Sequence, residues 1–169
     1  MLLVGGASTR FGSPKALAQL DGETLAERAW RLLGDACDER IAVGKRDDGL
    51  ELSFDLLDDG TDVRAPIAGV VAGLRAARHD VAVVIPVDVP LLTTAALHEL
   101  AAACRDVAMP PSGPLPGAYR RTALPALERA LADDRLALHA AIADLDVAIV
   151  ELDAALLVNV NTPGDVQRL

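Results

Sequence analysis

The chain has 169 residues and a formal net charge of −9 at pH 7, and 51% of its residues are hydrophobic. This length suits a single domain over residues 1–169, and the hydrophobic content argues against a disordered chain. The acidic balance argues against nucleic acids and membrane surfaces as partners, because clustered Lys and Arg supply the affinity for both. We find no signal peptide and no apolar run long enough to cross a bilayer, so we expect a cytoplasmic protein.

The first half of the chain alternates between short apolar runs and amphipathic stretches. Leu2 to Val4 predicts a very short buried strand, and TLAERAWRLL at 24–33 predicts a helix with its leucines on one face. Strands are expected at 40–44 and 53–57. Ile67 to Arg78 again has helical spacing, because its apolar residues share a face.

The second half continues this pattern. VAVVIP at 81–86 predicts a buried strand most clearly, because it is continuous and β-branched. Thr93 or Thr94 can cap a helix that runs to Arg105. Further elements are expected in chain order: strands at 107–109 and 117–120, helices at 122–131 and 136–145, a strand at 147–150, and a short helix opening at Thr162-Pro163.

Alternating strands and helices predict an α/β domain with a mostly parallel sheet covered on both faces. In such sheets, ligands bind at the carboxyl ends of the strands. Four segments should therefore share one rim, although they are distant in sequence: 5–15, 58–66, 87–90 and 158–163.

The first of these segments, GGASTRFGSPK, combines backbone freedom with positive charge. Gly5 and Gly6 let the backbone approach a ligand closely, and Arg10 and Lys15 can bind a polyphosphate. The segment matches neither the Walker A motif nor the dinucleotide GxGxxG motif. The alternative interpretation is a plain glycine-rich turn with two solvated cations.

Asp88 follows the VAVVIP strand and is flanked at a distance of two residues by Pro86 and Pro90, which stiffen the turn. Mg²⁺ commonly takes one or two carboxylates together with phosphate oxygens, so Asp88 is a candidate metal ligand against a triphosphate. The alternative interpretation is an aspartate that only helps to form the turn.

These segments resemble the nucleotidyltransferase superfamily, and most of all the molybdenum cofactor guanylyltransferases. That family's first motif, L-x-G-G-x-S-x-R-x-G-x-x-K-A-L, matches LVGGASTRFGSPKAL at 3–17. Its other motifs match in order at Pro66–Gly69, Asp88–Pro90, Pro114–Arg121 and Asn159–Pro163. The likeness therefore spans nearly the whole chain.

The resemblance implies a three-layer Rossmann-like fold and a magnesium-dependent transfer of GMP from GTP to the terminal phosphate of molybdopterin, with release of pyrophosphate. The nucleophile is already an anion, so no general base is needed. The protein must align two polyanions and neutralise the charge that develops on the leaving group. Arg10, Lys15 and an Mg²⁺ on Asp88 suit those tasks.

The resemblance also assigns binding roles. Leu3, Gly5 and Gly6 would line the guanine and ribose site, and Lys15 would contact the phosphates. One aspartate among Asp58, Asp59 and Asp62 is implied to contact the nucleotide; the motif leaves open which one, and Asp59 is our candidate. The acceptor side of the cleft would carry Asn159 and Asn161.

Two alternatives remain at this stage. A sister enzyme would use CTP or another phosphorylated acceptor, and a catalytically inactive relative would only bind nucleotide. We expect a monomer that makes at most transient contacts with other enzymes of cofactor biosynthesis.

Overall fold

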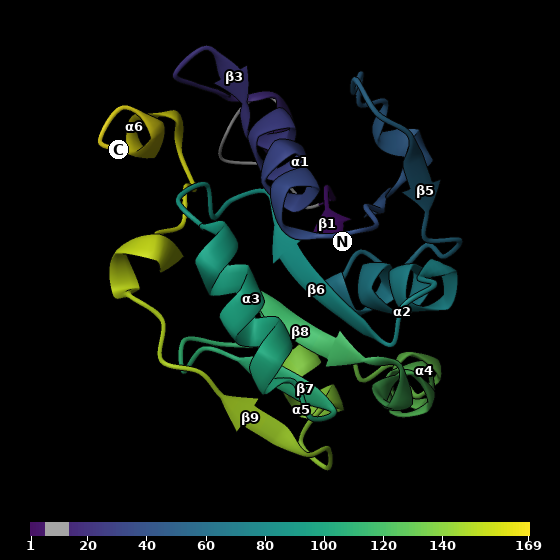
Figure 1. Cartoon of the computed structure of the whole chain (residues 1–169). Coiled ribbons are helices and arrows are strands. Elements are labelled where there is room, and N and C mark those ends of the chain that lie inside the picture. Colours follow the sequence, from purple (N-terminus) through teal and green to yellow (C-terminus); the bar gives the residue numbers. More distant parts are fainter. Residues whose placement is uncertain (6–13) are drawn as a thin grey trace.

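The computed structural model describes residues 1–5 and 14–169. Gly6 and Arg10, which are predicted to bind the nucleotide, lie outside these residues. In the described part of the chain, one sheet has the strand order β5-β4-β1-β6-β8-β7-β9 (Figure 1). Its strands are β1 (Leu2–Leu3), β4 (Ala42–Gly44), β5 (Leu56–Asp58), β6 (Val81–Pro86), β7 (Val107–Met109), β8 (Gly117–Arg120) and β9 (Val147–Ile149). The α-helices are α1 (Leu25–Ala36), α2 (Pro66–Ala76), α3 (Thr94–Ala103), α4 (Leu124–Ala132), α5 (Leu138–Ala141) and α6 (Pro163–Val166).

The sheet is mostly parallel, which confirms the predicted fold class. The short strand β1 lies between β4 and β6, and Leu2 is opposite Ala42 on one side and Ile85 on the other. Strand β8 runs antiparallel to both of its neighbours, β6 and β7. The strands on the β5 side of β8 therefore all point their carboxyl ends toward the same edge.

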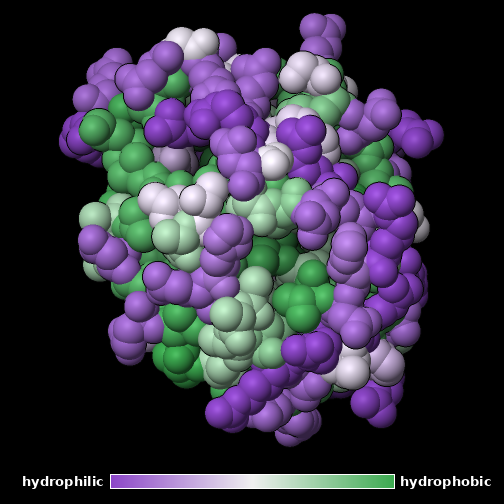
Figure 2. Space-filling view, in the orientation of Figure 1, coloured by the Kyte–Doolittle hydropathy of each residue, from purple (hydrophilic) through white to green (hydrophobic). Residues whose placement is uncertain are grey.

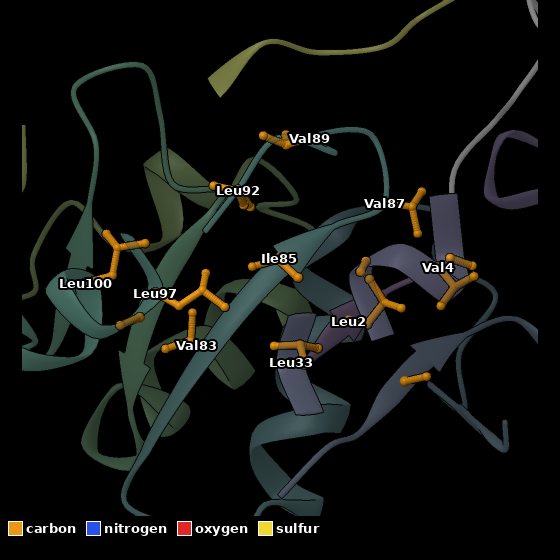
Figure 3. Packing of buried hydrophobic residues seen from close by; sticks show 14 of the residues in the cluster. Leu2, Val4, Leu33, Val83, Ile85, Val87, Val89, Leu92, Leu97 and Leu100 are labelled. Carbon is orange, nitrogen blue, oxygen red and sulfur yellow. The ribbon is translucent and has the colours of Figure 1, made fainter. Parts of the chain in front are cut away.

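Helices cover both faces of the sheet because consecutive strand residues point to opposite sides. On one face, Leu2 and Ile85 pack with Leu33 of α1 and Leu97 of α3 (Figure 3). On the other face, the neighbouring strand residues pack against α2, α4 and α5 in a second cluster, which contains Leu3, Val84, Ile67, Leu127 and Leu138. This arrangement gives the three layers that the alternating pattern predicted.

A two-stranded hairpin before α1 was not predicted. Strands β2 (Gln19–Leu20) and β3 (Glu23–Thr24) pair in antiparallel fashion around Asp21 and Gly22, whose φ angles are 53° and 83°. Asp-Gly is a strong signal for such a turn, because both residues tolerate positive φ. Thr24 then caps α1 through a capping box with Glu27.

Among the predicted elements whose bounds differ in the structure, three show what starts or ends an element. The strand expected at 53–57 is Leu56–Asp58, because its partner β4 has only three residues to pair with. The helix expected at 122–131 begins as a 3-10 turn at Arg121–Ala123, before α4. The helix expected at 136–145 is the single turn α5, because the chain must turn into β9 immediately afterwards.

The face seen in Figure 2 is dominated by hydrophilic residues with smaller hydrophobic areas between them. Among the described residues, the exposed large hydrophobic side chains are Leu57, Ile149, Val158 and Leu169. None of the helices in the described part of the chain has the length and apolar character needed to span a membrane.

Candidate active site

A pocket of about 360 Å³ lies at the carboxyl edge of the parallel strands. Its lining includes one residue that follows each of the four neighbouring strands: Gly5 after β1, Lys45 after β4, Asp59 after β5 and Asp88 after β6. The rule for ligand sites in open α/β sheets thus locates the pocket correctly. Asp59 and Asp88 were candidate site residues from the sequence, whereas Lys45 was not.

A first polar cluster, the Lys15 cluster, consists of Lys15, Asp88 and Asn161. Lys15 Nζ donates to Asp88 Oδ2 at 3.2 Å and to Asn161 Oδ1 at 3.1 Å, across 73 and 146 residues of sequence. The side chains of Lys15 and Asp88 are 17% and 27% exposed. The structure therefore brings together three residues that the sequence analysis named from three separate motifs.

Buried neighbours fix the direction of both charged side chains in this cluster. Val87 and Val89 are 7% and 5% exposed, so Asp88 between them projects out of the core. Lys15 begins a short 3-10 helix, Lys15–Leu17, in which Ala16 is buried. Alternation with small apolar anchors thus places the charged groups at the edge of the pocket.

The chain terminus reaches the pocket through Val160, which is fully buried and donates its backbone N–H to Asp88 O at 2.8 Å. Its neighbours Asn159 and Asn161 are exposed; Asn159 lines the pocket and Asn161 contacts Lys15. Asp165 in α6 accepts hydrogen bonds from the backbone of Asn161 and from Thr162, and these bonds lower the pKa of Asp165 to about 2. The capping box of α6 therefore fastens the segment that carries the two asparagines.

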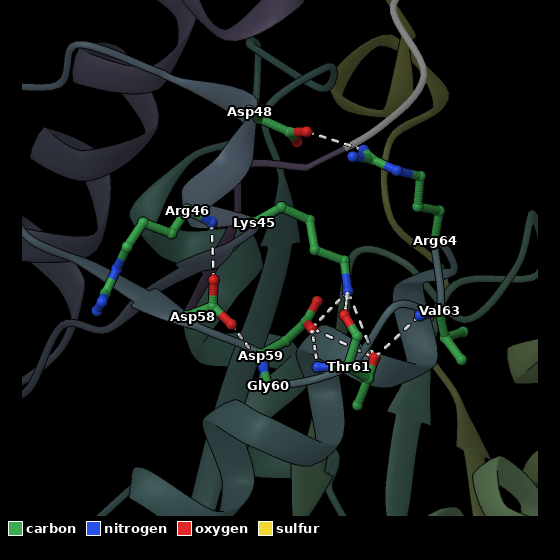
Figure 4. A network of polar contacts seen from close by, with 9 residues as sticks. All are labelled: Lys45, Arg46, Asp48, Asp58, Asp59, Gly60, Thr61, Val63 and Arg64. Carbon is green, nitrogen blue, oxygen red and sulfur yellow. Dashed lines mark hydrogen bonds and ion pairs between the residues drawn. The ribbon is translucent and has the colours of Figure 1, made fainter.

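A second polar cluster, the Lys45 cluster, consists of Lys45, Asp59 and Thr61 (Figure 4). Lys45 Nζ donates to Asp59 Oδ1 at 2.6 Å, to Thr61 Oγ1 at 3.4 Å and to the Thr61 carbonyl oxygen. The side chains of Lys45 and Asp59 are only 12% and 7% exposed. Lys45 could have been found from the sequence, because it directly follows a predicted strand and thus lies on the same rim.

The structure distinguishes the three candidate aspartates by their surroundings. Asp59 lines the pocket. Asp58 instead accepts the backbone N–H groups of Arg46 and Gly60, which lower its pKa. Asp62 is exposed and is not among the lining residues.

The remaining wall of the pocket is largely apolar. It includes Leu3, Val43 and Pro66, together with Leu115 from the proline-rich stretch of the sequence. Gly69 of α2 also lines it, and a Cβ atom there would lie 2.8 Å from Leu3 Cδ2. Glycine at this position therefore lets α2 pack closely against β1 beneath the pocket.

Asp88 has the chemistry expected of a magnesium ligand. Among residues 1–5 and 14–169, its Oδ1 atom has no hydrogen-bond partner, and a hard cation prefers such carboxylate oxygens. Within that same part of the chain, no three His, Cys, Asp or Glu side chains are grouped to hold a metal. The arrangement therefore fits a cation that shares one protein carboxylate with phosphate oxygens.

A second cavity, of about 260 Å³, lies at the opposite, amino ends of the parallel strands. Its lining includes Cys37, Glu39 and His98 but none of the residues that the sequence analysis proposed for binding or catalysis. Burial raises the pKa of the Cys37 thiol, which disfavours the reactive thiolate. The second cavity therefore offers no feature that the sequence analysis linked to catalysis.

Comparison with known proteins identifies the family of this chain. Residues 1–148 match the family described as MobA-like NTP transferase domain. A molybdenum cofactor guanylyltransferase of Desulfosudis oleivorans is 29% identical, with 99% of this chain and 92% of that protein covered. A protein of Deinococcus radiodurans named "Probable molybdenum cofactor guanylyltransferase" is 34% identical, with 99% and 91% covered.

Solved structures show the same fold. Molybdopterin-guanine dinucleotide biosynthesis protein A from Archaeoglobus fulgidus superposes with a TM-score of 0.80 at 24% identity, covering 99% of this chain and 94% of that one. The 2-C-methyl-D-erythritol 4-phosphate cytidylyltransferase of Thermus thermophilus gives a TM-score of 0.76 at 21% identity, covering 99% and 94%. The family model matches most of the chain, and the relatives span it. The chain therefore belongs to the MobA-like NTP transferase family and is a nucleotidyltransferase.

Proposed function

We propose that this nucleotidyltransferase transfers GMP from GTP to the terminal phosphate of a molybdopterin-type acceptor and releases pyrophosphate. The observation that supports this most strongly is the Lys15 cluster. Lys15 and Asp88 lie 73 residues apart in sequence, yet their side chains meet at 3.2 Å beside a pocket of nucleotide size. The names of the full-length relatives support guanine as the base and the molybdenum cofactor as the acceptor.

The proposed chemistry needs electrostatic stabilisation and no proton-abstracting residue. A phosphate of the acceptor attacks the α-phosphate of GTP, the bond to the β-phosphate breaks, and the electron pair leaves with pyrophosphate. Lys15 neutralises the charge on the phosphates, and Arg10 is proposed to assist it. Asp88 would hold Mg²⁺, which when bound supplies further positive charge to the phosphate oxygens.

The two ends of the pocket are suited to different parts of the substrates. The amino end of α2 faces the pocket through Ala65 and Pro66, and Ala65 provides no capping side chain, so the helix dipole favours anions there. Asn159 and Asn161 are proposed to face the acceptor, beside Asp88. Leu3 and Gly5 are proposed to face the nucleoside from the end of β1.

Pyrophosphate release tests the proposal. Purified full-length chain is incubated with Mg²⁺, molybdopterin and one of GTP, CTP, ATP or UTP, and pyrophosphate is measured. We expect release with GTP only, and a loss of about 10²-fold or more in Asp88→Asn. Thermal-shift titrations with the same nucleotides should show the largest stabilisation with GTP, because ligands stabilise the folded state they bind.

Asp80→Asn is the matched control, because Asp80 immediately precedes the opposite end of the same strand β6 and is exposed. The control should keep wild-type rates. Equal or larger stabilisation and turnover with CTP would make the protein a cytidylyltransferase. Absence of turnover with every nucleotide, despite GTP binding, would instead indicate an inactive nucleotide-binding relative.

A further inference from the structure

We propose that Lys45 is a positioning residue for base selection: it holds Asp59 so that one carboxylate oxygen accepts hydrogen bonds from the donor edge of guanine. This inference rests on the proposed function and adds Lys45, a residue that would hold the candidate nucleotide-contacting aspartate in place. Lys45 stands in none of the motifs that carried the family resemblance. The argument therefore depends on the contacts of the Lys45 cluster.

The Lys45 ammonium group is fully engaged within the protein. It has three N–H donors, and it contacts three acceptors: Asp59 Oδ1, Thr61 Oγ1 and the Thr61 carbonyl oxygen. Its side chain is 12% exposed. Lys45 is therefore suited to fixing its neighbours rather than to binding a phosphate itself.

The two oxygens of Asp59 differ in their surroundings. Oδ1 accepts from Lys45 Nζ, from Thr61 N at 3.1 Å and from Thr61 Oγ1 at 3.3 Å. Oδ2 has no hydrogen-bond partner among the described residues, and it carries no dashed line in Figure 4. Because the described residues include no fully buried side-chain oxygen without a partner, Oδ2 remains accessible. Asp59 lines the pocket, and because Oδ1 is engaged by Lys45 and Thr61, Oδ2 is the oxygen that a ligand in the pocket could use.

An ionised carboxylate oxygen only accepts hydrogen bonds, and this selects among the bases. Guanine presents two adjacent donors, N1–H and the N2 amino group. Adenine and cytosine present a ring-nitrogen acceptor next to a single amino group, and that acceptor would face the negative oxygen. Asp59 Oδ2 therefore matches guanine in both polarity and number of donors.

The sheet spacing supports a contact with the base rather than with the ribose. Asp59 follows β5 and Asp88 follows β6, and the strand order β5-β4-β1-β6 separates them by three strand spacings, or about 14 Å. If Asp88 marks the phosphates, the far wall at Asp59 faces the opposite end of the nucleotide. That end is the base.

Nucleotide titrations on the full-length chain test the inference. Dissociation constants for Mg-GTP and Mg-ITP are measured by calorimetry, because inosine lacks only the N2 amino group. The wild type should bind GTP about tenfold to hundredfold more tightly than ITP, as expected for one charge-assisted hydrogen bond. Lys45→Met should reduce this ratio to below about threefold by weakening GTP more than ITP, because ITP keeps only the N1–H donor to Asp59, and Lys45→Arg should restore it.

The matched control is Arg75→Met, which removes another cation paired with a carboxylate, Glu128, at 2.7 Å on the surface of α2. It should leave the GTP/ITP ratio unchanged. If Lys45→Met does not fold, Lys45→Gln takes its place, because glutamine keeps a donor for Thr61 but lacks the charge.

Three outcomes overturn the inference. An equal loss of GTP and ITP affinity in the Lys45 variant would show that Lys45 has only a structural role. If the wild type bound GTP and ITP equally but bound 2′,3′-dideoxy-GTP more weakly, Asp59 would contact the ribose and not the base. Preference of the wild type for CTP over GTP would defeat the proposed function as well, and this outcome separates the two failures.

Discussion

The Lys15 cluster and the Lys45 cluster each pair a lysine with an aspartate beside the same pocket, yet they are built differently. Lys15 lies 73 residues from Asp88, and their side chains are 17% and 27% exposed. Lys45 lies 14 residues from Asp59, and their side chains are 12% and 7% exposed. The first cluster thus depends on the tertiary fold and is the more exposed of the two, mainly at its aspartate, whereas the second closes a short connection between adjacent strands.

This difference indicates different tasks. An open ion pair is weak, so its members can exchange each other for a phosphate or a metal ion when substrates bind. A closed pair is stronger and costly to break, so its members keep their geometry. The Lys15 cluster is therefore suited to chemistry on charged groups, and the Lys45 cluster to forming a fixed wall.

The largest expected effect separates the two clusters by activity. Lys15→Met should lower kcat/KM for pyrophosphate release by about 10²–10³-fold, because it removes a positive charge that stabilises the transition state. The free energy of unfolding should change by less than about 1 kcal/mol, because the ion pair with Asp88 is partly exposed. Parallel assays of turnover and urea unfolding measure both values. A variant that unfolds readily but keeps its turnover would contradict the comparison.

The next effect separates the clusters by stability. Lys45→Met should lower the free energy of unfolding by about 1–3 kcal/mol, because it leaves Asp59 with a poorly compensated charge. The double variant Lys45→Met/Asp59→Leu should recover most of that loss, because an apolar pair replaces the ion pair. Urea unfolding of the wild type, of both single variants and of the double variant gives the coupling energy between Lys45 and Asp59. A loss no larger than that of Lys15→Met would remove the distinction between the clusters.

The smallest effect concerns the segment that carries Asn161. Hydrogen bonds from Asn161 N and from Thr162 depress the pKa of Asp165 from its usual 3.8 to about 2. The stabilisation that ionised Asp165 gives to this segment is therefore complete above about pH 4 and is lost as the pH falls through 2. Amide NMR signals of Asn161 and Thr162 should report a transition near pH 2 that is absent in Asp165→Asn. A midpoint near 4 would show that these bonds do not form in solution.

Much of the fold follows from local pattern. The β-branched run of β6, the helical spacing of α2 and the capping residue Thr93 all agree with the structure. The hairpin at Asp21-Gly22 also had a sequence signal, which we did not use. The lengths of β5 and α5 were wrong, because a pairing partner or a following strand ends an element irrespective of its own propensity.

For the site, the sequence by itself determined which polar and charged residues lie in the predicted rim segments, including Lys15, Asp88, Asn159 and Asn161. Tertiary structure alone decided how they combine: Lys15 with Asp88 and Asn161, and Asp59 rather than Asp58 or Asp62 against Lys45. The physical reason is that residue type and spacing specify local backbone geometry. Which of several neighbouring carboxylates faces a pocket depends instead on hydrogen bonds formed with residues elsewhere in the chain.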